Sequence, residues 1–407
     1  MTPSHSDRDL WGEALHLIPG GTHTISKRVT TFLDADHFPP YVIRGKGAWL
    51  YDREGRRYLD YIAALGAVLL GYAVDRIDDR VARQLRDGFL FSLPHPCEVE
   101  LARVLTKLVP SAEQVRLFKT GAEATSAAIR VARLATGRER VLCCGYHGWH
   151  DWWAVVRSPA GIPVAQRGLI TEFPFNDLEA FRVALDSQPG GWAAVILTPA
   201  AYGTEPAPGF LPGIRDETTR RGIPLIFDEV ITGFRWALGG AQARFGVTPD
   251  LTCIGKAMAN GMPLSALVGC ARLMEPMKDN WISSTYASDA LAIVAALETL
   301  EILCEQPILE ELQSKASLLQ QGIVNLSVDT GADLWVGAQA PAIRFGFNGP
   351  ADDQARRVRQ FVAGCVRRGV LVRRDGSGIS LCLMAAVTPA DIESTLSLFR
   401  SVLHEIH

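Results

Sequence analysis

Short apolar segments separated by helical patterns are the feature of this sequence that most restricts its fold. These segments occur at residues 115–118, 141–144, 193–197, 223–227, 251–254 and 264–268. After the first of them, Ala124, Ala128, Val131 and Leu134 recur at helical spacing. Largely apolar strands that alternate with helices are typical of a mostly parallel sheet covered on both faces. The sequence therefore predicts an α/β fold, with a ligand site beyond the carboxyl ends of the strands.

Charge and cysteine usage exclude several classes of protein. The chain of 407 residues carries 41 Lys+Arg and 44 Asp+Glu, so its formal net charge is -3. A general nucleic-acid binder would be basic, and a membrane span would need ~18 consecutive apolar residues, which this chain lacks. The N-terminus has no signal pattern, and the eight cysteines contain no C-x-x-C pair. We expect no nucleic-acid partner, no membrane partner and a cytoplasmic location.

Three regions are expected along the chain. Residues 1–60 hold a helical start and a strand-turn-strand pattern, and we expect this N-terminal segment to contribute to a small domain. Residues 61–300 would form the large, ligand-binding domain, and residues 301–407 would form the rest of the small domain. Near the end of the chain, Arg373 and Arg374 stand between two apolar runs. They indicate either a hairpin turn or an arginine that faces a substrate.

Two strands are followed by residues suited to catalysis. Asp228 ends the apolar run 223–227, and Lys256 follows the run 251–254 after Gly255. Asp228 is either a helix cap or solvated loop acid, or a buried acid that holds a cation. Lys256 is either an exposed lysine or a desolvated amine with a lowered pKa, able to form a Schiff base. It is not a phosphate-loop lysine, because no Ser or Thr follows it.

Two further strand ends carry binding features. Residues 119–124, Lys-Thr-Gly-Ala-Glu-Ala, lie where a helix begins, so they form either a phosphate-binding cup or an ordinary capped helix start. Residues 145–153 contain four aromatic side chains and two histidines. An aromatic residue there could stack on a flat ligand or fill a packing corner. A metal site of His147 and His150 with Cys143 or Cys144 fits no standard zinc spacing, and we expect no metal.

These features together describe one cofactor. A lysine binds an aldehyde, an acid protonates a ring nitrogen, a helix end holds a phosphate and an aromatic side chain covers a ring. Pyridoxal 5'-phosphate (PLP), which acts as an electron sink and passes through a pyridoxamine form, needs this set of groups. The sequence therefore predicts a PLP site.

The sequence resembles the class III aminotransferases, PLP enzymes of fold type I, and within them the glutamate-1-semialdehyde aminomutase-like branch. The resemblance begins near Ile18 and runs into the C-terminal region. Its most specific stretch is residues 227–269, where the spacing from Asp228 to Lys256 matches the family's. Shorter matches are residues 121–124, 146–148 and 284–286. The resemblance implies a large domain with a mostly parallel mixed sheet flanked by helices, and a smaller α+β domain built from the N- and C-terminal segments.

The resemblance also implies roles around the cofactor ring. Lys256 would form the Schiff base with the cofactor and then move protons between cofactor and substrate carbons. Asp228 would keep the pyridinium nitrogen protonated. Val230 would pack on one face of the ring and Tyr146 on the other, and His147 would belong to the same cofactor-binding set.

A second set of roles concerns the cofactor phosphate. Thr120, Gly121 and Ala122 would hold this group. Thr285 would reach the phosphate bound to the neighbouring subunit, which implies a homodimer with shared active sites.

The chain departs from the family pattern at several positions. Ala122 replaces a family threonine, so one hydroxyl is lost while the backbone N–H stays. Thr198 replaces the glutamate of a Glu-Pro pair. Residues 23–28 replace the Asn-Ser-Pro-Val-Arg segment of the tetrapyrrole-pathway aminomutase. This argues against glutamate semialdehyde as substrate and for a specialised amine, such as an amino sugar or another secondary metabolite. Lys27 and Arg28 either contact an anionic substrate or lie in a solvated loop.

The expected function is transfer of an amino group between an amino donor and a ketone or aldehyde of a small metabolite. An aminomutase of the glutamate-1-semialdehyde type, or an epimerase, starts from the same bond to the amine and stays open as an alternative. A non-catalytic protein that kept the fold also stays open, because Ala122 and Thr198 depart from the family. The presence of both Lys256 and Asp228 argues against it.

Overall fold

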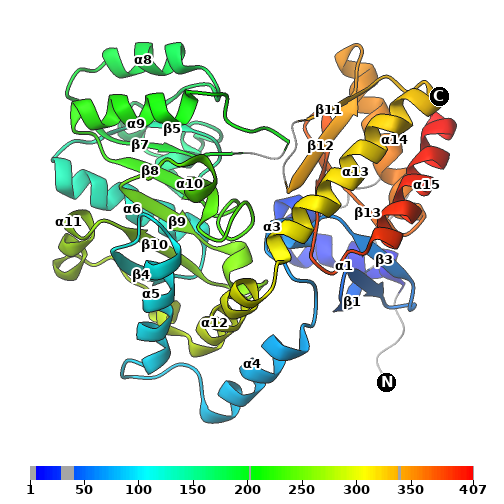
Figure 1. The fold of residues 1–407 in the computed structure, drawn as a ribbon, viewed down its shortest axis with the longest axis horizontal. Helices are drawn as coiled ribbons and strands as arrows, with labels where there is room; N and C mark the ends of the chain where they lie inside the picture. The colour runs from blue at the N-terminus through cyan, green and yellow to red at the C-terminus, as the bar shows by residue number, and fades with distance from the viewer. Residues whose placement is uncertain (1–5, 29–40, 201–202, 338–340, 407) are drawn as a thin grey trace.

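A seven-stranded mixed sheet forms the centre of the larger part of the molecule, on the left in Figure 1. The computed structural model describes residues 6–28, 41–200, 203–337 and 341–406. In spatial order the strands are β4 (Gln114–Phe118), β10 (Ser265–Gly269), β9 (Leu251–Ile254), β8 (Leu225–Glu229), β7 (Trp192–Leu197), β5 (Arg140–Cys144) and β6 (Ile170–Glu172). β10 runs antiparallel to both of its neighbours, and the other pairs are parallel. This confirms the predicted mostly parallel sheet.

Helices cover both faces of this sheet. They are α5 (Pro96–Leu108), α6 (Gly121–Thr136), α7 (Asp151–Ala154), α8 (Leu178–Asp186), α9 (Phe210–Arg221), α10 (Gly240–Phe245), α11 (Ala271–Met274) and α12 (Ala290–Glu305). α4 (Asp75–Asp87) packs on α12. Ala194 and Ile196 of β7 pack in the same cluster as α6, whereas Val195 and Leu197 pack in the cluster of α8 and α9. Successive strand residues point to opposite faces, so a strand covered on both sides must be apolar throughout.

The smaller part contains two four-stranded sheets. The first is β1 (Val42–Lys46), β2 (Trp49–Asp52), β3 (Arg57–Asp60) and β13 (Val370–Leu371), and the second is β11 (Leu334–Val336), β12 (Ala342–Phe347), β15 (Gly378–Cys382) and β14 (Arg373–Asp375). α13 (Ile308–Thr330), α14 (Ala351–Arg367) and α15 (Pro389–Ile406) pack around them. β13 pairs in parallel with β3, so strands from the two ends of the chain lie side by side (Figure 1).

The hairpin near the C-terminus differs from the predicted one. Arg373 and Arg374 are not turn residues; they belong to β14, which pairs antiparallel with β15. The chain reverses at Gly376 and Ser377. β13 and β15 belong to different sheets, so the two apolar runs do not pair with each other. The side chains of β14 are polar, so the sequence shows no apolar run there. The strand is formed by backbone hydrogen bonds to β15.

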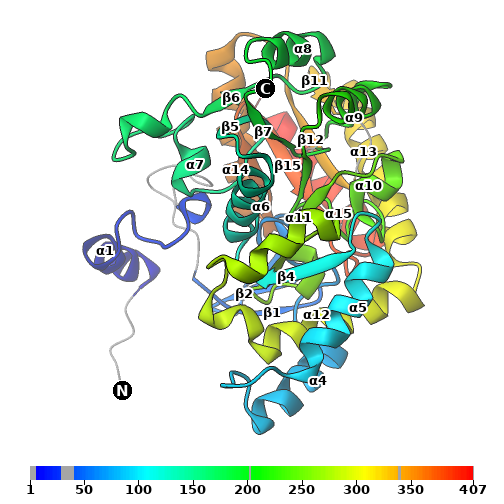
Figure 2. The ribbon, with the colours of Figure 1, turned by 90° about the vertical axis from the view of Figure 1, so that its left-hand side faces the viewer.

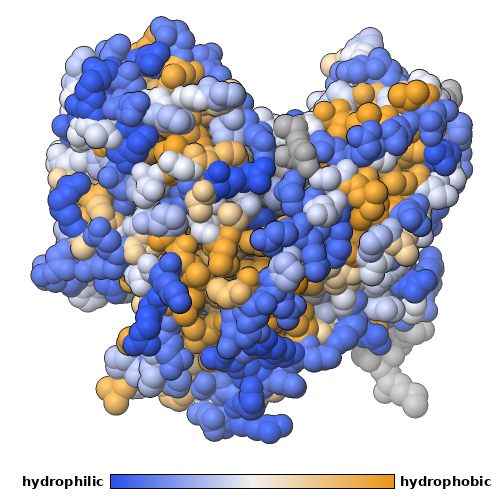
Figure 3. All heavy atoms as spheres, in the orientation of Figure 1, coloured by the Kyte–Doolittle hydropathy of each residue, from blue (hydrophilic) through white to orange (hydrophobic). Residues whose placement is uncertain are grey.

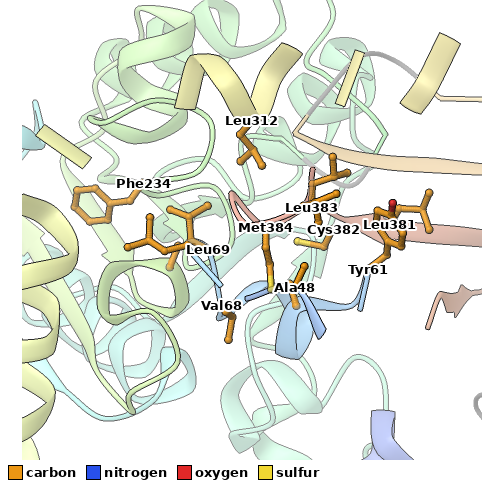
Figure 4. Packing of buried hydrophobic residues seen from close by; sticks show 14 of the residues in the cluster. Ala48, Tyr61, Val68, Leu69, Phe234, Leu312, Leu381, Cys382, Leu383 and Met384 are labelled. Carbon is orange, nitrogen blue, oxygen red and sulfur yellow. The ribbon is translucent and has the colours of Figure 1, made fainter. Parts of the chain in front are cut away.

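The largest buried cluster joins the two parts. Figure 4 shows members of this cluster from the first hairpin, the large sheet region and the C-terminal strand, namely Ala48, Tyr61, Val68, Leu69, Phe234, Leu312, Leu381, Cys382, Leu383 and Met384. Above this shared core the surface is notched, and hydrophobic residues gather in the middle of the same face (Figure 3). The parts are therefore held together by one core.

Two peripheral features complete the fold. α1 (Asp7–Leu17) has no fully buried residue and lies at the periphery (Figure 2), where Trp11 packs against the largest core cluster and Asp7 pairs with Arg53 at 2.9 Å. Short 3-10 helices lie at η1 (Ile25–Lys27), η2 (Val164–Gln166), η3 (Lys256–Ala259), η4 (Glu275–Asp279) and η5 (Thr285–Ser288). Every helix in the described ranges is too short or too polar to cross a lipid bilayer.

Candidate active site

A cavity of about 300 Å³ lies at the carboxyl ends of the large sheet. This is the size of a small-molecule site and the position at which α/β sheets bind ligands. The cavity is lined by eight of the predicted cofactor-binding residues: Thr120, Gly121, Ala122, Tyr146, His147, Asp228, Val230 and Lys256. The ninth, Thr285, is exposed on η5 and does not line the cavity of its own chain.

A larger cavity, of about 430 Å³, lies at the opposite edge of the sheet. Arg138, Arg215 and Asp250 line it, and Arg215 already pairs with Asp250 at 2.9 Å. This cavity lies near the amino ends of the strands and contains none of the predicted site residues. We therefore place the chemistry in the smaller cavity.

Asp228 is held by two donors at the end of β8. The Nδ1 atom of His147 lies 2.8 Å from Oδ2 of Asp228, and the N–H of Val230 donates to Oδ1 at 3.2 Å. An ionised carboxylate only accepts, so Nδ1 carries the hydrogen of the first bond. His147 is buried, and its Nε2 has no hydrogen-bond partner in the described structure. His147 was predicted to bind the cofactor, and the structure places its ring against Asp228.

Lys256 begins η3 in a strained conformation. Its φ is 45°, which is uncommon for a residue other than glycine and typical of functional sites. Burial lowers the pKa of the Lys256 amine; the Asp228 carboxylate opposes this, and the charges of Arg373 and Arg235 reinforce it. A lowered pKa leaves more of the amine neutral at neutral pH, and the neutral amine is the nucleophile.

The N-terminus of α6 is a capping box with two free donors. Thr120 accepts from the N–H of Glu123 at 3.3 Å and donates its hydroxyl to Oε2 of Glu123 at 3.1 Å. The same Glu123 oxygen accepts from the N–H groups of Lys119 and Thr120. No described residue accepts from the N–H groups of Gly121 and Ala122, so these two donors are left for a ligand.

Close packing shapes the walls beside these donors. A Cβ added at Gly121 would lie 2.8 Å from Cγ1 of Val230, so only glycine fits between the cup and that side chain. A Cβ added at Gly148 would lie 2.6 Å from the Cβ of Ala122. Tyr146 is 65% exposed at the mouth, with its ring 4.8 Å from that of Trp153. The free N–H groups therefore open into a walled space with an aromatic side chain at its entrance.

Two residues that the sequence analysis missed hold the backbone on either side of Ala67, which lines the cavity. Arg235 is fully buried and donates to the carbonyl oxygens of Leu383, Gly66 and Val68 at 2.8, 3.1 and 3.1 Å. Asn260 accepts from the N–H groups of Leu69 and Leu70, both at 2.9 Å. Both residues lie within 227–269, the stretch singled out for its spacing, but their partners are far away in the sequence.

The loop that these two residues hold is itself unusual. In α3 (Ala63–Gly66) three consecutive non-glycine residues, Ala63, Ala64 and Leu65, have positive φ values of 51°, 49° and 62°. Such residues cost roughly 1–2 kcal/mol each, so the surroundings must stabilise the turn. Asp60 contributes by accepting from the N–H groups that open it. The turn leads into Ala67, which lines the cavity.

The residues that were considered as substrate contacts differ in their position relative to the cavity. Lys27 and Arg28 are exposed and do not line the cavity. Thr198 lines the cavity. Arg373 is half-buried and does not line it, but its Nε is buried and no hydrogen-bond or ion-pair partner is found among the described residues. Within the same described ranges, no group of three or more His, Cys, Asp and Glu side chains is arranged to hold a metal ion.

The cavity has the parts that PLP requires: a reactive amine, a fixed carboxylate and free helix N–H groups. The fold and the site therefore define a PLP-dependent transferase of fold type I. The family model of class III aminotransferases matches residues 33–403, and the chain belongs to this family. The predicted family, fold class and cofactor are confirmed.

Two curated relatives show how close the similarity is. The chain is 41% identical over 313 residues to the 3-aminobutyryl-CoA aminotransferase of Cloacimonas acidaminovorans, with 75% of each chain covered. It is 40% identical over 340 residues to the glutamate-1-semialdehyde 2,1-aminomutase of Thermomicrobium roseum, with 79% of this chain and 78% of the relative covered. The second supports the predicted aminomutase-like branch.

Solved structures agree with the fold. The PLP internal aldimine form of the FumI protein of Sphingopyxis sp. MTA144 matches with a TM-score of 0.91 and 30% identity, covering 98% of this chain and 96% of that one. An omega-transaminase of Sphaerobacter thermophilus matches with a TM-score of 0.89 and 28% identity, covering 100% and 98%. The predicted aminotransferase activity is in accord with these relatives and with the family.

Proposed function

We propose that Lys256 and Asp228 are the catalytic residues of this PLP-dependent aminotransferase, and that the N-terminus of α6 holds the cofactor phosphate. One observation carries the proposal: Lys256 after β9, Asp228 at the end of β8 and the free N–H groups of α6 line a single cavity. Three chain segments that are distant in sequence thus supply the three groups that the cofactor needs.

Each residue has a distinct chemical task. When bound, PLP supplies an aldehyde that captures amines and a ring that accepts an electron pair. Lys256 would hold that aldehyde, and its free amine would then move a proton to and from carbon, a role typically worth ~10²–10⁴-fold in rate. Asp228 would hold a proton at the ring nitrogen, and His147 would fix the orientation of its carboxylate. Val230 and Tyr146 flank the space for the ring.

The phosphate group would be held by backbone donors. Gly121 and Ala122 offer free N–H groups at the positive end of the α6 dipole, which favours anions. The hydroxyl of Thr120 is already engaged by Glu123, so we assign Thr120 mainly to capping this helix.

Replacing Lys256 tests the catalytic assignment. We expect Lys256→Ala to abolish the visible absorption of the lysine-bound cofactor and nearly all turnover, because the amine that would hold the cofactor aldehyde is removed. Absorption spectra and single-turnover mixing with an amino donor measure both. Thermal unfolding of the apo variant controls for loss of fold. Retention of both signals in Lys256→Ala would contradict the assignment.

Intramolecular amino transfer is the second candidate, and the aminomutase relatives favour it. The two reactions differ in their need for a separate amino donor. Product analysis with and without an added donor distinguishes them. Isomerisation of one compound without a donor would replace the aminotransferase proposal by the aminomutase or epimerase.

We further propose that the amine substrate carries an anionic group that Arg373 recognises. A buried Nε without a hydrogen-bond partner among the described residues is costly, and an incoming carboxylate or phosphate would pair with it. Burial is the main cause of the lowered pKa of the Lys256 amine, and the charge of Arg373 also helps to lower it.

The Arg373 proposal predicts a substrate-dependent defect. We expect Arg373→Gln to raise KM for acidic amino donors by roughly 10- to 100-fold, because a hydrogen bond to a charged group contributes about 1.5–3 kcal/mol. Neutral amines should be affected less than threefold. The adjacent Arg374→Gln serves as the matched control and should behave like the wild type. An equal loss with acidic and neutral amines would refute a role in recognition.

We propose a homodimer in the cytoplasm. Large apolar side chains are exposed on two segments, at Phe89, Leu90, Phe91 and Leu93 and at Trp281 and Tyr286. The segments are neighbours, because the carbonyl of Phe89 accepts from the N–H of Ala290 at 2.8 Å. Exposed apolar patches of this kind mark interaction surfaces. Thr285 is exposed beside Tyr286, as a residue shared with a partner subunit would be, and all eight cysteines are free thiols, which suits a reducing compartment.

A further inference from the structure

Lys119 lines the cofactor cavity, and neither the family resemblance nor the mechanism gives it a task. It directly precedes the capping residue of α6. Among the described residues that line the cavity, Lys119 and Lys256 are the two cations, and Asp228 is the anion. Because Lys256 is committed to the cofactor aldehyde, Lys119 is the cation left for any other charge. This inference rests on the proposed cofactor site.

The phosphate of the cofactor brings a charge that the backbone alone does not match. A phosphate monoester carries about -1.5 to -2 charges at pH 7. The carboxylate of Glu123 lies beside the two free N–H groups. It already accepts hydrogen bonds from the backbone N–H groups of Lys119 and Thr120. At Ala122 the side chain has no hydroxyl to donate. The start of α6 therefore offers one donor fewer to a phosphate and has the Glu123 carboxylate nearby. For both reasons, a cation is needed to stabilise a bound phosphate.

Lys119 is held in place for such a role. Its Nζ lies 2.8 Å from Oδ2 of Asp289, and both side chains are only 15% exposed. The other oxygen of Asp289 accepts from the N–H of Leu291 at 2.9 Å and caps α12. An ammonium group has three donors, and Asp289 is the acceptor found for Lys119 Nζ in the described part of the chain. Asp289 thus fixes the ammonium and leaves donors free.

We propose that Lys119 is the electrostatic partner of the cofactor phosphate, positioned by Asp289, and that it compensates for the hydroxyl missing at Ala122. Lys119 is then the residue that makes this chain select the phosphorylated cofactor over unphosphorylated pyridoxal. The competing explanation is an ion pair that only ties β4 to the start of α12. The two explanations differ in which ligand a substitution affects.

Titration of the apo protein with two ligands separates these explanations. PLP and pyridoxal share the aldehyde and the ring nitrogen and differ in the phosphate. We expect Lys119→Met to weaken PLP binding by about tenfold or more, because a charge-assisted contact is lost. Pyridoxal binding should change less than twofold. Lys119→Arg, which keeps the charge, should restore most of the PLP affinity.

Asp289→Asn tests the positioning. It removes the anion that fixes the ammonium but keeps the charge of Lys119 and an amide able to cap α12, so PLP binding should weaken less than in Lys119→Met, and pyridoxal binding should again change less than twofold. Equal weakening of PLP and pyridoxal by Lys119→Met, unchanged PLP binding in that variant, or equal weakening of PLP and pyridoxal by Asp289→Asn would each overturn the inference. Wild-type protein that forms no lysine-bound cofactor would instead refute the proposed site, so the two failures are distinguishable.

Discussion

Lys256 combines a strained backbone, burial and a nearby carboxylate, and each has a separate consequence. The positive φ fixes the direction in which the side chain leaves η3. Burial raises the share of neutral amine at neutral pH, and Asp228 limits this effect. The reactivity of the residue therefore comes from its position at the strand end, where the chain enters the cavity.

The lowered pKa of Lys256 also predicts how stability depends on pH. An unfolded lysine titrates near about 10.4, so below that pH the unfolded chain binds more protons at this position than the folded chain does. Stability must then rise with pH between the lowered pKa and about 10.4. We expect the free energy of unfolding of the apo wild type to increase with pH relative to Lys256→Met, measured by urea unfolding. A constant or falling difference would contradict burial of this amine.

Site residues that directly follow an apolar strand could be predicted from the sequence. The roles of residues whose partners are far away in the sequence could not. Asp228 and Lys256 follow recognisable apolar runs, and both line the cavity. His147 was grouped with the cofactor, yet its bond to Asp228 spans 81 positions and has no local signal. Arg235 contacts carbonyls up to 169 positions away. A single sequence does not encode such partners in any local pattern.

The start of α6 shows how one element creates the site. Thr120 and Glu123 satisfy each other and stop the chain from extending the helix backwards. The next two N–H groups stay free because the first turn of a helix has no internal acceptors. Gly121 lets Val230 approach this turn closely. The anion-binding property thus follows from where the helix begins.

Substitution of Gly121 tests this close packing. An added Cβ would meet both methyl groups of Val230, at 2.8 and 2.9 Å, so Gly121→Ala should displace Val230 and weaken PLP binding by about tenfold. Gly12→Ala in α1 is the control, because nothing lies within 4 Å of its new Cβ. It should stabilise the protein by about 0.5–1 kcal/mol without changing the PLP titration. Equal behaviour of the two variants would show that the contact is unimportant.

The elements that sequence patterns missed share a physical cause. The six apolar segments all correspond to strands of the large sheet, because a strand buried on both faces must be apolar. β6 is an edge strand of three residues, and β14 consists of Arg373, Arg374 and Asp375. Both are held by backbone pairing to a neighbour, and backbone hydrogen bonds leave no mark on side-chain composition.

At the scale of the whole molecule, large apolar side chains are exposed on two segments that are distant in sequence and linked by the hydrogen bond between Ala290 and Phe89. Leu93 is 79% exposed and Trp281 is 94% exposed, which is unfavourable for a free monomer. We expect the double variant Leu93→Glu and Trp281→Glu to convert a dimer into monomers of 44.3 kDa and to weaken PLP binding, because Thr285 would no longer reach the partner's phosphate. Light scattering during gel filtration measures the mass.

A single exposed apolar residue on another element provides the control for that variant. Val328 on α13 is 81% exposed, and Val328→Glu should leave both mass and PLP affinity unchanged. A wild-type protein that elutes as a monomer, or a double variant that stays dimeric, would refute the proposed interface.

The pairing of β3 with β13 means that the first sheet cannot be completed until the C-terminal region has been synthesised. Roughly 300 residues separate the two strands, and synthesis at about 5–20 residues per second leaves roughly 15–60 s between them. Throughout that interval, the first hairpin has left the exit tunnel without its final strand. Its unpaired edge is the kind of surface that chaperones bind, so production of this protein should depend on them more than its ordinary composition suggests.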